Sequence, residues 1–104
     1  MNNQTKIKGD DGEFHAYIAK PENGKGIAIV CLQEIFGVNI WMRNIADELA
    51  KKGFIAIVPD LFWRIEENVQ INGEKEEDFA KAFDLYGKFD PIKSMLDINN
   101  TIDF

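Results

Sequence analysis

The sequence is poor in the residues that build metal centres and redox sites. It has 104 residues with one cysteine, Cys31, and one histidine, His15. A single cysteine permits no internal disulfide and no thiolate metal cluster, so we expect no metal and a reducing, cytoplasmic location. No glycine-rich phosphate loop follows either strongly apolar segment, which argues against a dinucleotide or P-loop site.

Long apolar runs and basic clusters are also missing. The longest apolar run, residues 27–32, is far shorter than the ~20 residues of a membrane-spanning helix. The N-terminal stretch MNNQTKIKGDDGEF lacks the apolar core of a signal peptide. The chain has 12 Lys and Arg and 18 Asp and Glu, which gives a net charge of −6, and the basic residues are scattered along the sequence. We therefore expect neither a nucleic-acid nor a membrane partner.

The composition is that of one globular domain. Hydrophobic residues make up 45% of the chain, which is enough for a core at this length. We expect disorder only over residues 1–5 and 66–75, where the sequence is polar.

The order of apolar segments predicts an α/β fold. GDDG joins two short strands into a hairpin, and two continuous apolar strands flank a helix that Asn39 caps and that ends at Gly53. Strand, helix and strand in this order form a right-handed crossover with a parallel sheet. The expected strands are residues 6–8, 13–20, 26–32 and 54–58.

Three helices have apolar residues at helical spacing. The second helix is expected over residues 74–86, and the third begins at Asp90-Pro91. The predicted apolar positions are Trp41, Ile45 and Leu49 in the first helix, Phe79, Ala82, Phe83 and Tyr86 in the second, and Ile92, Met95, Leu96, Ile98 and Ile102 in the third.

Several reactive residue types have simple structural interpretations. His15 lies in an outer strand and is expected on the surface, whereas Cys31 lies in a buried strand as a small core residue. Asp60 and Arg64 follow a strand's carboxyl end, and we expect them to form a structural ion pair.

The segment QEIFGVN is the strongest candidate for a functional site. It leaves the carboxyl end of a predicted central strand, where open α/β sheets place ligands. Ile35 and Phe36 offer backbone N–H groups and an apolar wall, and Gly37 permits a tight bend. Glu34 is either a functional carboxylate or the ion-pair partner of Arg43 or Arg64, and the residues alone leave both alternatives open.

Here the chain resembles a known family. QEIFGVN, the pair Met42-Arg43, the run KGFIAIVPDLFWR and the later Phe89-Asp90 resemble the N-terminal half of the dienelactone hydrolases. The resemblance implies the N-terminal portion of an α/β-hydrolase fold: a hairpin, a parallel βαβ unit and two further helices. Residues 1–104 would form one partial domain that stops before the nucleophile elbow.

The resemblance also implies roles for particular residues. Glu34 matches the glutamate that contacts the nucleophile, and Ile35 matches the residue whose N–H forms half of the oxyanion hole. Phe36, Phe83 and Tyr86 match substrate-binding positions. The implied reaction is ester or lactone hydrolysis through a Cys or Ser acyl-enzyme, without a cofactor.

Two departures from the family pattern limit this interpretation. Near Phe79 the dienelactone-cleaving members have an arginine that binds the substrate carboxylate, whereas the nearest basic residues here are Lys75 and Lys81, so dienelactone itself is not the expected substrate. No G-x-[SC]-x-G is present, and His15 cannot serve as the triad base. We therefore expect this chain to be inactive alone.

Two other functions remain open. The chain could be a non-catalytic half-domain that pairs with a complementary C-terminal half or with itself. It could also be a small flavodoxin-like module that binds an anion at the helix N-terminus beside Asn39.

Overall fold

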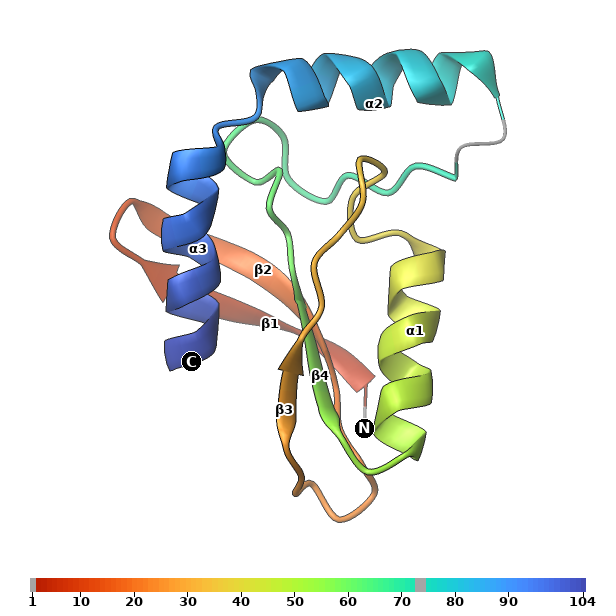
Figure 1. Cartoon of the computed structure of the whole chain (residues 1–104), viewed down its shortest axis with the longest axis vertical. Helices are drawn as coiled ribbons and strands as arrows, with labels where there is room; N and C mark the ends of the chain where they lie inside the picture. The colour runs from red at the N-terminus through yellow and green to blue at the C-terminus, as the bar shows by residue number, and fades with distance from the viewer. Residues whose placement is uncertain (1, 73–74) are drawn as a thin grey trace.

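The computed structural model describes residues 2–72 and 75–104 as one mixed α/β unit. Within these residues a four-stranded sheet has the strand order β1-β2-β4-β3 (Figure 1). The elements in chain order are β1 (Asn2–Gly9), β2 (Gly12–Ala19), β3 (Ala28–Val30), α1 (Ile40–Lys51), β4 (Ile55–Pro59), α2 (Glu76–Lys88) and α3 (Pro91–Asp103).

The sheet confirms the predicted hairpin and crossover. β1 pairs with β2 and β2 with β4 in antiparallel fashion, whereas β3 and β4 are parallel. β3 is shorter than predicted, although single bonds from Cys31 N–H to the Ile57 carbonyl and from Ile55 N–H to the Ile27 carbonyl extend its pairing at both ends.

The expected disorder is wrong where the structure tests it. Residues 2–5 belong to β1, and residues 66–72 form turns and a short bridge. Residues 73–74, including the predicted start of the second helix, lie outside the described residues; α2 begins at Glu76 and continues to Lys88.

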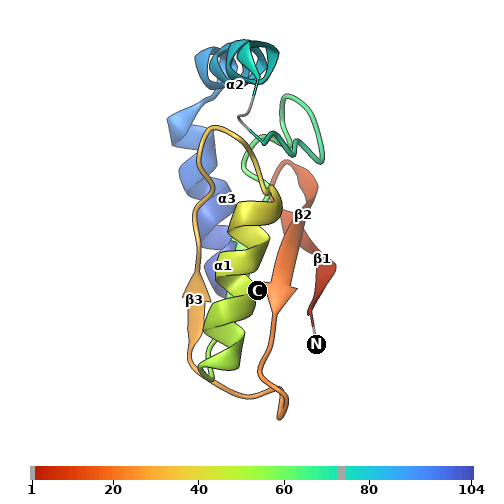
Figure 2. The same ribbon diagram turned by 90° about the vertical axis from the view of Figure 1, so that its right-hand side faces the viewer.

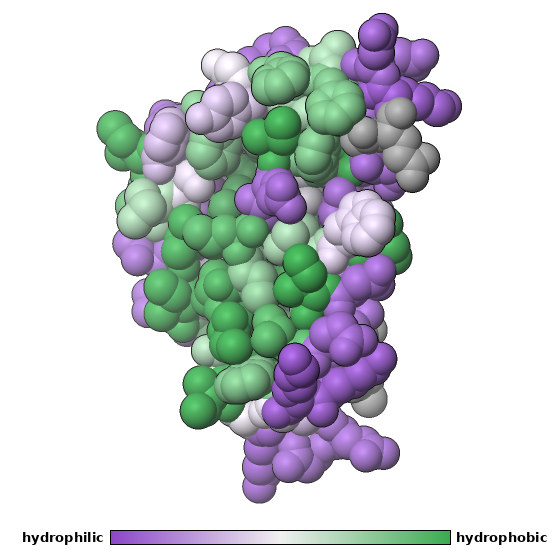
Figure 3. Space-filling model, turned by 45° about the vertical axis from the view of Figure 1, so that its right-hand side comes forward, coloured by the Kyte–Doolittle hydropathy of each residue, from purple (hydrophilic) through white to green (hydrophobic). Residues whose placement is uncertain are grey.

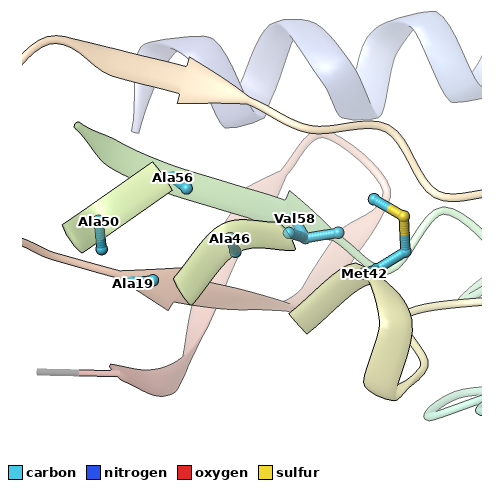
Figure 4. Close-up of a cluster of buried hydrophobic side chains, with 6 residues drawn as sticks. All are labelled: Ala19, Met42, Ala46, Ala50, Ala56 and Val58. Atoms are coloured by element: carbon cyan, nitrogen blue, oxygen red, sulfur yellow. The ribbon is translucent and has the colours of Figure 1, made fainter. Parts of the chain in front are cut away.

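Helix α1 covers one face of the sheet with a face different from the predicted one. The Asn39 side chain caps it, accepting a bond of 3.1 Å from Met42 N–H, and Gly53 follows its end at a φ of +98°. Trp41 and Ile45, expected on the apolar side, are 62% and 49% exposed. Figure 4 shows the close-packed cluster that forms instead, consisting of Ala19, Met42, Ala46, Ala50, Ala56 and Val58.

Helix α3 lies on the opposite face of the sheet from α1 (Figures 1 and 2). Its buried residues are polar: Ser94, Asp97 and Thr101. The reason is Asp97, which accepts bonds from Trp63 Nε1 at 2.9 Å and from Arg64 Nε and Nη2 at 3.0 and 2.9 Å. The predicted apolar side therefore turns outward, with Ile92, Met95, Leu96 and Ile102 all exposed.

The edge strand β3 also leaves apolar residues uncovered. Within the described residues β3 pairs only with β4, and Ile27 and Leu32 beside it are 74% and 52% exposed. Figure 3 shows how much of one face of the molecule consists of hydrophobic residues. None of the described helices is both long enough and apolar enough to cross a bilayer.

Candidate functional site

The candidate site lies where β3 and β4 end. Because these strands are parallel, their carboxyl ends meet at the same edge of the sheet, and Figure 1 shows both chain segments leading from there toward α2. A cavity of about 160 Å³ opens at this edge. Its lining residues are Gln33, Glu34, Ile35, Leu61, Phe62, Tyr86 and Phe89.

Gln33 joins the two loops that form the walls of the cavity. Its Oε1 accepts a hydrogen bond of 2.8 Å from Leu61 N–H, and its Nε2 donates one of 3.3 Å to the Glu34 carbonyl. The loop after β3 is thereby fixed to the loop after β4. Neither connection involves the Glu34 carboxylate.

Gly37 closes the turn that carries Glu34. Its N–H donates to the Glu34 carbonyl at 3.2 Å, and its φ of +79° lies in the left-handed region that favours glycine. A Cβ at this position would overlap the backbone carbonyl of Val69, because residues 37 and 70 form an isolated bridge. The turn therefore requires glycine both for its backbone angle and for space.

The Glu34 side chain is free to interact with a ligand. It is exposed, and among the described residues it has no hydrogen bond and no ion pair. Arg64 binds Asp97 and Asp11, and the buried Nε of Arg43 has no acceptor. The structural alternative for Glu34, an ion pair with either arginine, is therefore wrong in this structure.

The backbone of Ile35 is also available. Within the described part of the chain its N–H has no hydrogen-bond acceptor, although the Ile35 side chain packs against a buried cluster. That cluster consists of Phe62, Val69, Ile71, Ala82 and Leu85. Ile35 thus lines the cavity and has a backbone donor without a partner in the described part of the chain.

The three predicted substrate-binding aromatics have different positions. Tyr86 lines the cavity and is 60% exposed. Phe36 lies behind Ile35 in the same cluster, with its ring 5.7 Å from that of Phe79 in an edge-to-face arrangement. Phe83 is 61% exposed on α2 and is not among the cavity-lining residues.

The sequence assigned Gln33 no role of its own, although this residue begins the candidate segment QEIFGVN, and it did not single out Leu61, Phe62 or Phe89 as site residues. Leu61 and Phe62 follow the end of β4, so their position after a parallel strand was an available signal. Phe89 directly follows α2, and only the packing of its ring 5.9 Å from that of Phe62 brings it to the cavity.

Asp60 and Arg64 do not pair with each other. The Asp60 carboxylate accepts hydrogen bonds from Phe62 N–H at 3.2 Å and Asn68 N–H at 3.0 Å, and burial raises its pKa. Arg64 instead binds the carboxylates of Asp97 and Asp11. The predicted ion pair is wrong, and Asp60 organises the turn that positions Leu61 and Phe62.

His15 and Cys31 lie away from this cavity. His15 is half-buried, with a buried Nδ1 that has no partner, so its assignment to the surface is wrong. Cys31 packs against the α1 cluster as predicted, and burial raises the pKa of its thiol. A raised pKa disfavours the nucleophilic thiolate.

The N-terminus of α1 is closed to an anion. Asn39 is 3% exposed; its Oδ1 caps the helix, and its Nδ2 donates a bond of 2.7 Å to the Ile71 carbonyl. The Asn39 side chain and the Met42 N–H are thus engaged within the chain, which does not favour a flavodoxin-like module that uses them for an anion.

A strand order of β1-β2-β4-β3, with ligand-accessible loops after the two parallel strands, is that of the N-terminal part of an α/β-hydrolase fold. A crystal structure from Klebsiella pneumoniae subsp. pneumoniae, described as a "Putative Dienelactone Hydrolase", superimposes with a TM-score of 0.78 at 27% identity. It matches 97% of this chain and 41% of its own. The predicted fold class is confirmed.

The chain belongs to the dienelactone hydrolase family, whose family model matches residues 14–103. A "Putative carboxymethylenebutenolidase" of Azospirillum brasilense is 48% identical over 82% of this chain and 37% of its own length. The "Carboxymethylenebutenolidase" of Pseudomonas putida is 31% identical over 94% and 42%. The chain therefore spans about two fifths of the length of these relatives.

Proposed function

We propose that this chain supplies part of the active site of a dienelactone hydrolase-type enzyme that cleaves an ester or lactone. The nucleophile, a Cys or Ser, and the Asp and His of the triad come from chain outside these 104 residues, because none of the described residues forms a nucleophile turn. The observation that supports this proposal is one cavity lined by both Glu34 and Ile35, whose carboxylate and N–H respectively have no partner among the described residues.

Each of these two groups has a role in acyl transfer. The nucleophile gives its proton to the His of the triad and adds to the substrate carbonyl, whose oxygen becomes negative and accepts a hydrogen bond from Ile35 N–H. The carbonyl then re-forms as the alkoxide leaves with a proton from the His, and water releases the acyl group from the enzyme. A thiol beside Glu34 keeps its proton until substrate displaces the carboxylate, because a neighbouring like charge raises the thiol pKa.

Complementation tests this proposal. We expect the 104-residue chain alone to show no hydrolysis of p-nitrophenyl acetate above the buffer blank. Fusion to the C-terminal part of the Azospirillum relative, beginning after its matched segment, is expected to give activity. The same C-terminal part without this chain is the control.

Two outcomes would contradict the proposal. A correctly folded fusion with no esterase activity would remove the assigned function. Activity of the chain alone that persists in a variant with both His15→Ala and Cys31→Ala would place the catalytic machinery elsewhere.

The open sheet edge favours a second candidate function, a half-domain that pairs with another chain. β3 has a partner on one side only within the described residues, and the apolar side chains of Ile27 and Leu32 are exposed beside it. An unpaired apolar edge is a template for another strand. The partner we propose is a complementary C-terminal half or a second copy of the chain.

A further inference from the structure

The cavity that contains Glu34 has no positive charge in its lining. Five of its seven lining residues are apolar or aromatic: Ile35, Leu61, Phe62, Tyr86 and Phe89. The Gln33 amide is occupied by its two bonds to the loops. Glu34 carries the only carboxylate among the described lining residues, and this carboxylate has no partner among the described residues.

Two lysines of α2, the helix that carries Tyr86, are paired elsewhere. Lys81 binds Glu66 at 2.9 Å, and Lys88 binds Asp84 at 3.1 Å. Neither lysine lines the cavity. A ligand carboxylate in this cavity would therefore meet the negative charge of Glu34 and an apolar wall, with no cation to compensate for its lost hydration.

We propose that the part of the active site built by this chain selects neutral, apolar acyl or lactone groups and rejects substrates that carry a carboxylate. This inference rests on the proposed function and names its substrate class. It separates the chain from relatives called carboxymethylenebutenolidase, a name that denotes a butenolide ring bearing a carboxymethylene group. An apolar cavity with few polar groups is the environment that a neutral ligand prefers.

Binding to the purified chain tests the inference without any turnover. The two probes are 5-methylene-2(5H)-furanone, which is neutral, and the same ring with a carboxymethylene group, which is an anion at pH 7. Amide chemical shifts of Ile35, Leu61 and Phe62 report binding at the cavity. We expect the dissociation constant of the neutral probe to be lower by about fivefold or more, the size of the repulsion between two like charges about 4 Å apart in water.

Two arginine variants on α2 show whether the preference between the probes depends on charge in the cavity or on the overall charge of the protein. Tyr86→Arg places a cation in the lining and is expected to remove or reverse the preference. Phe83→Arg adds the same charge at an equally exposed position outside the lining, 61% against 60% exposed, and is expected to keep the preference. Glu34→Gln removes the repelling charge and is expected to reduce the preference for the neutral probe.

The possible results either support or overturn this inference. Equal affinity, tighter binding of the carboxylated probe, or no shift of the cavity amides with either probe would overturn it. An equal response to Tyr86→Arg and Phe83→Arg would also overturn it. Failure of the fused enzyme to hydrolyse esters would instead contradict the proposed function, because the binding ratio is measured on this chain without catalysis.

Discussion

Glu34 and Ile35 are neighbours in the chain, but they present opposite chemistry to the same cavity. In the proposed reaction the Glu34 carboxylate would repel developing negative charge, whereas the Ile35 N–H would stabilise it. The tight turn that Gly37 closes leaves the Glu34 side chain exposed, while the half-buried Ile35 side chain packs against a buried cluster.

For a fused enzyme whose nucleophile is a cysteine, we predict that Glu34→Gln slows turnover by at least about tenfold and makes the resting cysteine easier to alkylate. The amide keeps the shape of the side chain but not its charge, so the restraint on thiolate formation is lost. Kinetics on a small lactone and iodoacetamide labelling measure the two effects. Unchanged turnover together with unchanged labelling would show that the Glu34 charge has no part in the reaction.

At Gly37 the predicted effect is on stability. Gly37→Ala should lower the free energy of unfolding by about 2 kcal/mol or more, because the new methyl group combines a left-handed φ with overlap on the Val69 carbonyl. Chemical denaturation of the two proteins measures the difference.

Gly24→Ala is the matched control for Gly37→Ala. Gly24 has a similar φ of +69°, but a Cβ there would have nothing within 4 Å. Its substitution is expected to cost only the strain of the backbone angle, about 1 kcal/mol. Equal losses for the two variants would mean that the Val69 contact imposes no constraint.

The sequence could predict those site residues that depend on local position, but not those that depend on packing. Glu34 and Ile35 follow a parallel strand, and this position alone indicated a ligand site. Phe89 and Phe83 both lie in or just after α2, and nothing local shows that Phe89 contributes to the cavity and Phe83 does not. That difference follows from how α2 packs on Phe62 and the loop after β4.

Among the secondary-structure elements, β2 and α1 are joined by a polar contact as well as by the alanine cluster. Tyr17 OH donates a hydrogen bond of 2.7 Å to Asp47 Oδ1. Burial, and next the bond to Asp47, raise the pKa of Tyr17 from its usual 10.0 to about 12. The folded state therefore holds the phenolic proton more tightly than the unfolded chain does.

We predict that stability falls as the pH rises from about 10 to about 12 and that Tyr17→Phe removes this component. A folded-state pKa above the unfolded value contributes stability that is complete below pH 10 and is lost as the pH rises through the folded pKa. Denaturation at a series of alkaline pH values measures the slope. Tyr86→Phe, which alters an exposed tyrosine, is the control, and equal slopes in all three proteins would contradict the prediction.

The number and order of elements could be predicted from the sequence, but the buried faces of the three helices could not. In α2 only Ala82 of the predicted apolar positions is buried, and Phe79, Phe83 and Tyr86 are exposed. In α1, Met42, Ala46 and Ala50 repeat with the same spacing as Trp41, Ile45 and Leu49, so periodicity alone cannot choose between the two faces. In α3 the buried Asp97 decides the orientation through its bonds to Arg64 and Trp63. Interactions between distant residues thus outweighed the larger apolar surface in α1 and α3.

At the scale of the whole molecule, the uncovered apolar surface predicts association. We expect the purified chain to elute from size exclusion as a species larger than a monomer, and Ile27→Lys to shift it toward monomer. A lysine beside β3 places a charge at the open edge, which opposes pairing with another strand.

Ile92→Lys tests whether the β3 edge is the surface responsible. Ile92 is 80% exposed near the start of α3 and is not part of the sheet edge, so Ile92→Lys adds the same charge at a comparably exposed position. It is expected to leave the elution volume unchanged. A monodisperse, monomeric wild-type chain in light scattering would contradict the predicted association.

The alanine-lined contact between α1 and the sheet limits which amino-acid substitutions the protein can accept. Ala19, Ala46 and Ala56 have no exposed surface, and alanine has no side-chain rotamers to lose on folding. A side chain larger than alanine by even one methyl group would force helix and sheet apart. The only smaller residue is glycine. We therefore expect almost no substitution to be tolerated at these three positions, whereas most exposed positions of the chain can accept other residues.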